Sequence, residues 1–180
     1  MATIKKSKVT VSFLGIIGIL LIAVWLFVPA TQARAETVKI KYSTQFTKRE
    51  VVLVPGEKGH IVGLYERRGV AIVENEVAAT AICGTLDGIK KKASFQGYTQ
   101  LTFKDGSTWA LTHQGTLVRP PGEELGLYKI KGAFIKGTGR FEGIKGKYSG
   151  TGRYITPFTK DETKGDNWME ITATYTLPKK

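Results

Sequence analysis

Hydrophobic and polar residues alternate along most of this chain. Between residues 38 and 46, Val38, Ile40, Tyr42 and Phe46 fall on one face, and Lys39, Lys41, Ser43 and Gln45 fall on the other. A period of two is typical of a β-strand with one buried face. The same alternation places Met169, Ile171, Ala173, Tyr175 and Leu177 together near the end of the chain. Both segments are therefore predicted to be half-buried strands.

Turn signals separate further alternating segments. Asp105-Gly106 lies between residues 95–103 and 108–117 and predicts the clearest hairpin. Asp87-Gly88 predicts a second turn, and residues 74–76 a hairpin tip. Strands are also expected over 61–67, 70–73, 77–85 and 128–135, with a possible break at 67–69.

About eight strands result, and no amphipathic helix separates them. Short, evenly spaced strands indicate an antiparallel sandwich or a closed barrel. The interior of an eight-stranded barrel is either filled by side chains or holds one small ligand. Both possibilities stay open at this point.

The N-terminus has the pattern of a secretory signal. Lys5, Lys6 and Lys8 precede an uncharged run over 11–28, and Ala33-Arg34-Ala35 offers a small-x-small cleavage site. The run is also just long enough to span a bilayer, so an uncleaved membrane anchor is the alternative. We expect residues 1–35 to be a cleaved signal peptide and residues 36–180 to form one β-barrel domain, periplasmic or secreted.

The chain is basic, with a formal net charge of +12. Because the leader contains only four of the basic residues, the exported domain stays positively charged. Such a charge favours acidic envelope surfaces as partners, although many exported proteins are simply basic. Strand alternation places Lys145, Lys147 and Arg153 on one face and Tyr148 and Tyr154 on the other. Nucleic acid is not expected, because single strands need cations and aromatic rings on one surface.

Cysteine and histidine are too sparse for a disulfide or a metal site. Cys83 is the only cysteine, so no intrachain disulfide can form. Its alternation with Val77, Ala79 and Ala81 predicts a core-facing side chain. The two histidines and Cys83 lie on different predicted strands and lack the close spacing of zinc ligands. No metal and no cofactor are predicted.

A glycine-rich motif occurs twice, as Gly137-Thr-Gly-Arg-Phe141 and as Gly150-Thr-Gly-Arg-Tyr154. Glycines at this density let a strand bend or bulge, which closing a small barrel requires. The first unit, with the strand after it and the terminal strand, resembles the barrel shared by allene oxide cyclases and plant dirigent proteins. Residues 94–116 also look like bacterial exported barrel proteins of this kind.

The resemblance covers about residues 38–178. It implies an eight-stranded antiparallel barrel, often a homodimer or homotrimer, with a mainly apolar lumen and no cofactor. Known members steer cyclisation or coupling of a bound substrate more by shape than by cofactor chemistry. The residues that carry over are Gly137, Gly139, Arg140, Phe141 and Gly143, and the role implied for them is structural.

Two ionisable residues are candidates for acid–base chemistry. His113 alternates with Trp109 and Leu111, so a neutral imidazole is expected in apolar surroundings. It could transfer protons, or it could be a core histidine bonded to a hydroxyl. Glu66 shares a predicted face with His60 and is expected in the lumen, where a raised pKa would suit a general acid. The alternative for Glu66 is a barrel mouth or an arginine partner, and His60 is expected to be a strand-entry residue.

Aromatic positions separated by glycines predict a ligand site in the lumen, lined by Tyr42, Trp109, His113, Tyr148, Tyr154 and Tyr175. The sequence thus favours an exported barrel that binds a small apolar or aromatic molecule without converting it. One alternative is a cofactor-free cyclase or isomerase that uses His113 or Glu66. The other is a basic protein that interacts with the envelope.

Overall fold

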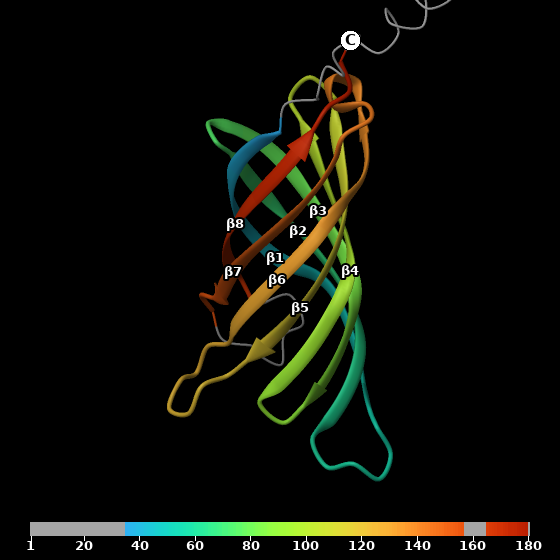
Figure 1. Ribbon diagram of the computed structural model, residues 1–180. Coiled ribbons are helices and arrows are strands. Elements are labelled where there is room, and N and C mark those ends of the chain that lie inside the picture. The colour runs from blue at the N-terminus through green and yellow to red at the C-terminus, as the bar shows by residue number, and fades with distance from the viewer. Residues whose placement is uncertain (1–34, 157–164, 180) are drawn as a thin grey trace, which may run out of the picture. The chain divides into compact units, whose positions relative to one another are not determined.

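The computed structural model describes residues 35–156 and 165–179, which form a closed antiparallel β-barrel (Figure 1). Each strand pairs with the next along the chain, and the last pairs with the first. The strands are β1 (Glu36–Leu53), β2 (His60–Val73), β3 (Glu76–Ile89), β4 (Lys92–Phe103), β5 (Thr108–Val118), β6 (Leu127–Thr138), β7 (Lys145–Tyr154) and β8 (Asn167–Thr176). The predicted all-β, eight-stranded antiparallel barrel is confirmed.

Residues 1–34 lie outside the described part of the chain, and the predicted signal segment ends one residue beyond them. Cleavage, anchoring and export therefore stay predictions. In the part that is described, no helix is long and apolar enough to cross a membrane.

Aromatic rings fill the half of the barrel that contains the β2–β3, β4–β5 and β6–β7 connections. Trp109 is 1% exposed, and ring centroids of four neighbours lie between 5.0 and 5.5 Å from its own. These neighbours are Phe103, Phe134, Phe141 and Tyr175. Edge-on ring packing at such distances makes this end, called the filled half below, a solid core.

The first glycine-rich unit closes the filled half. Gly139 begins a single 3-10 turn over Gly139–Phe141 with φ +61°, a backbone conformation that favours glycine. A Cβ at Gly139 would lie 2.4 Å from Ser107 Oγ, the atom that accepts a hydrogen bond from the Arg140 backbone N–H at 3.2 Å. Alanine would therefore strain the backbone and disturb this contact.

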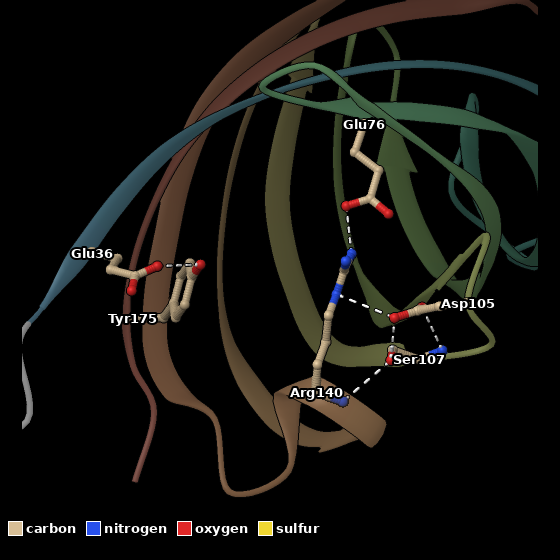
Figure 2. Close-up of polar contacts among 6 residues, drawn as sticks. All are labelled: Glu36, Glu76, Asp105, Ser107, Arg140 and Tyr175. Carbon is tan, nitrogen blue, oxygen red and sulfur yellow. Dashed lines mark hydrogen bonds and ion pairs between the residues drawn. The ribbon is translucent and has the colours of Figure 1, made fainter. Parts of the chain in front are cut away.

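Two side chains, Arg140 (Figure 2) and Phe141, tie this turn to other strands. The Arg140 guanidinium pairs with Glu76 at the start of β3 and lies 3.5 Å from Asp105 in the β4–β5 turn. The Phe141 ring is buried against Trp109. The second unit, by contrast, lies within or at the end of strand β7, so the sequence repeat is not a structural repeat.

Two local predictions are wrong. Asp87-Gly88 lies inside β3, and the turn falls at Lys90 and Lys91, where Lys90 adopts φ +56°. The predicted break at residues 67–69 is absent, because β2 runs continuously from His60 to Val73. Pairing with β1 and β3 along its length holds β2 extended through these residues.

Cys83 was also assigned to the wrong face, because its side chain is exposed. The inward positions at the start of β3 are Ala78 and Thr80 instead. Both faces of this strand carry small or apolar residues, so alternation alone does not identify the inner one. The predicted division of β7 is confirmed: Lys145, Lys147 and Arg153 are exposed, and Tyr148 is buried.

Candidate functional site

The other half of the barrel is hollow. A cavity of about 430 Å³ lies inside it and opens near the β1–β2, β3–β4 and β5–β6 connections. Every strand of the barrel contributes to the wall of this cavity, mostly with aromatic and aliphatic side chains. The inward-facing residues of the wall are Tyr42, Phe46, Tyr65, Arg67, Ile82, Leu86, Phe95, Thr99, His113, Leu117, Tyr128, Ile130, Tyr148, Tyr154, Asn167, Met169 and Ile171. Its volume lies within the usual range for small-molecule sites, roughly 300–1,000 Å³.

Larger hollows of about 1290 and 1210 Å³ lie along the outer strand faces. Exposed residues such as Glu50, Gln96 and Lys131 form much of their walls. A ligand there would stay largely in water, whereas the cavity inside the barrel is bounded by buried rings. We therefore regard the inner cavity as the candidate site.

His113 lies in the wall of this cavity and is 3% exposed. Its Nε2 is 2.7 Å from the Tyr65 hydroxyl and its Nδ1 is 3.1 Å from Thr99 Oγ1. Burial lowers the pKa of His113 to about 4, so the imidazole is neutral at physiological pH. A neutral imidazole has one N–H, so its tautomer decides whether Tyr65 donates to Nε2 or accepts from it.

The tyrosines of the wall are neutral as well. Burial raises the pKa values of Tyr42, Tyr65, Tyr128 and Tyr148 far above the ordinary range. The Tyr148 hydroxyl donates to the Thr112 carbonyl at 2.9 Å, and the Tyr128 hydroxyl to the Trp168 carbonyl at 3.4 Å. The rings of Tyr128 and Tyr148 thus line the cavity while their hydroxyls are held by the backbone.

Arg67 is the buried charge in this wall, and it was not identified from the sequence. Its Nε donates to Thr44 Oγ1 at 3.0 Å, and its Nη2 donates to the carbonyls of Thr44 and Gly165. The guanidinium carbon lies 3.9 Å from the centroid of the Phe46 ring, a cation–π distance. Alternation of Arg67 with Tyr65, Ala71 and Val73 was the available signal, and the expected strand break at this position concealed it.

Glu66 was placed in the lumen by sequence, and this is wrong. Its side chain is exposed on the outer face of β2, while Tyr65 and Arg67 point inward. The outer face of β2 carries apolar residues, among them Val62 and Leu64, which made it resemble a buried face. Glu66 therefore loses the environment on which its suggested role as general acid depended.

The predicted ligand-binding aromatics divide between the two halves. Tyr42, Tyr148 and Tyr154 line the cavity. Trp109 and Tyr175 face inward but pack in the filled half, where the Tyr175 hydroxyl donates to Glu36 at 2.7 Å (Figure 2). Alternation identified the face correctly but could not show which level of the barrel is hollow.

His60 begins β2, as expected, and lies outside the barrel. Its ring nitrogens are each 2.8 Å from a carboxylate oxygen, one of Glu57 and one of Asp87. Hydrogen bonds to Asp87 and Glu57 raise its pKa above the ordinary value. The described residues contain no group of three or more His, Cys, Asp or Glu side chains placed to hold a metal ion.

No family model matches the sequence, and no curated protein matches it. Among solved structures, the chain is similar to a pterocarpan synthase dirigent protein, with a TM-score of 0.44 and 16% identity over 84% of this chain and 95% of that one. Dirigent proteins are one of the two groups that the glycine-rich motif resembles. A similarity this low transfers no residue role and no activity.

Proposed function

We propose that the protein is exported and binds a small apolar or aromatic molecule in the hollow half of its barrel, without converting it. The observation that carries this proposal is the cavity itself, whose interior is walled mainly by neutral aromatic and aliphatic side chains. Such walls favour apolar ligands, because burying apolar surface is the main driving force for binding in an enclosed pocket. Export rests on the signal pattern of residues 1–35.

We expect the purified barrel to bind N-phenylnaphthylamine, a neutral aromatic probe whose fluorescence rises in apolar surroundings, with one probe per chain. Fluorescence titration gives the affinity and native mass spectrometry gives the stoichiometry. Ala93→Trp should weaken binding by about tenfold or more, because the added ring occupies the cavity wall. Ala79→Trp adds the same ring on the outer face and should leave affinity unchanged.

If N-phenylnaphthylamine does not bind, or if both tryptophan variants weaken it equally, the lumen is not the binding site. Thermal unfolding of both variants shows that each retains the barrel. Native mass spectrometry of protein from its own host adds a direct observation, because a bound small molecule appears as added mass.

A cyclase or isomerase is the second candidate, supported by the neutral His113 imidazole in contact with Tyr65 inside the cavity. This pair could move a proton on an enclosed apolar substrate. The molecule recovered from wild-type protein would then differ in chromatographic retention from the one recovered from His113→Gln produced in the same host. Identical retention, with binding preserved, leaves His113 with a structural role.

A further inference from the structure

Arg67 carries a charge inside the barrel without a carboxylate partner among the described residues. The side chain is 4% exposed. Its guanidinium donates to the Thr44 hydroxyl and to the carbonyls of Thr44 and Gly165, all of which are neutral. Its Nη1 is buried and has no hydrogen-bond partner in the part of the chain that the structure describes.

A buried cation without an ion-pair partner is costly, because removal from water favours the neutral form. The Asp166 carboxylate favours the charged form of Arg67 but forms no ion pair with it. Burial accordingly lowers the pKa of Arg67, although arginine stays protonated in proteins. The Phe46 ring offsets part of this cost through its electron-rich face. A carboxylate in direct contact with the guanidinium would offset far more of the cost of burial. The described cavity-lining residues include no such carboxylate.

The mouth of the cavity is also basic. Besides Arg67, the described residues of the cavity lining include Arg49, Lys90, Lys91, Lys92 and Arg119, and no Asp or Glu. A cleft with charges of one sign along low-dielectric walls attracts ions of the opposite sign. The mouth and the interior thus favour the same sign of ligand charge.

We propose that the ligand of the lumen carries an anionic group, a carboxylate or a chemically similar oxyanion, which pairs with the Arg67 guanidinium. The inference rests on the proposed function and specifies its ligand class: an apolar or aromatic body with one negatively charged end. The body lies along the rings of the cavity, and the anion accepts from Nη1. The basic mouth draws the ligand in.

A matched pair of probes tests this inference. Anilinonaphthalene sulfonate has the ring system of N-phenylnaphthylamine plus one sulfonate. We expect the wild-type barrel to bind the anionic probe about ten- to a hundredfold more tightly, the range expected of charge-assisted hydrogen bonds. Added salt should weaken only the anionic probe, because it screens the mouth.

Arg67→Gln should reduce the preference for the sulfonate probe, measured as the ratio of the two affinities, to about threefold or less. Arg68→Gln is the control, because Arg68 is the next residue of β2 and is exposed on the outer face. It removes the same charge from the chain, so a change seen in both variants would reflect net charge alone. Ala93→Trp should weaken both probes, which places them in the lumen.

The outcomes separate the two proposals. Equal affinities of the wild-type barrel for both probes, or a preference unchanged by Arg67→Gln, overturn the anionic ligand and leave lumen binding intact. Failure of both probes to bind overturns both proposals. Should Arg67→Gln not fold, the wild-type probe preference and its sensitivity to Ala93→Trp still decide whether the lumen favours an anionic ligand.

Discussion

Acidification from about pH 7 to about pH 4 should destabilise the barrel through His113 by about 3 kcal/mol. The folded-state pKa of His113 is about 4, against an ordinary value of 6.5. Between these values the unfolded chain binds a proton that the folded barrel does not. The contribution of His113 to the free energy of unfolding is therefore fully present above about pH 6.5 and is lost as the pH falls towards about 4. Below about pH 4, protonation of His113 changes the free energy of unfolding little further.

The measurement is urea unfolding of wild-type protein and His113→Gln at both pH values. Glutamine can keep a hydrogen bond to Tyr65 or Thr99 but does not titrate, so the variant should lose about 3 kcal/mol less on acidification. His60 provides a contrast. Its pKa is raised, so its contribution is present below pH 6.5 and is lost as the pH rises through its folded-state value. If wild type and His113→Gln lose the same free energy of unfolding on acidification, His113 is not the cause of the acid destabilisation.

Replacing Trp109 with alanine should cost about 3–5 kcal/mol of unfolding free energy. Trp109 is among the largest fully buried side chains, and Phe103, Phe134, Phe141 and Tyr175 all pack against it. Its removal leaves a void that rings on four elements cannot all move to fill. Because domains are stable by roughly 5–15 kcal/mol, the loss should be a large share of the total.

Trp168→Ala is the matched control, because Trp168 is only half-buried. We expect it to cost about 1 kcal/mol or less, since surface substitutions rarely cost more. Urea unfolding followed by circular dichroism measures both variants. Similar losses in the two would mean that the filled half is not the principal core of the barrel.

The filled half and the hollow half of the barrel differ in how their interiors are packed. Rings around Trp109, together with the glycine-rich turn at Gly139, close and stabilise one end. Because this end forms the packed core, the barrel is stable although its other end contains a cavity. Arg67 and His113 lie in the hollow half, where burial shifts the pKa values of both.

Alternation was sufficient to predict most strands and the inward faces of β1, β5, β7 and β8, whereas the choice of a barrel over a sandwich came from the glycine-rich motif and its resemblance. It succeeded there because these strands separate polar from apolar side chains sharply, as Lys147 and Tyr148 illustrate. It failed on β2 and β3, where Glu66 and Cys83 were assigned to the interior. Both strands carry apolar residues on their outer faces as well. The alternation is therefore present, but it does not identify which face points into the barrel.

The lumen itself depends on contacts between residues far apart in the chain. Tyr42 and Trp109 look alike in the alternating pattern, yet one lines a cavity and the other is packed among rings. The difference arises from which side chains the other strands bring to the same level of the barrel. The environment of Arg67 has the same origin, because Thr44, Phe46 and Gly165 reach it only when β1, β2 and the segment before β8 come together. Local periodicity reports the direction of a side chain, whereas its neighbours, and therefore its pKa and its chemistry, depend on closure of the sheet.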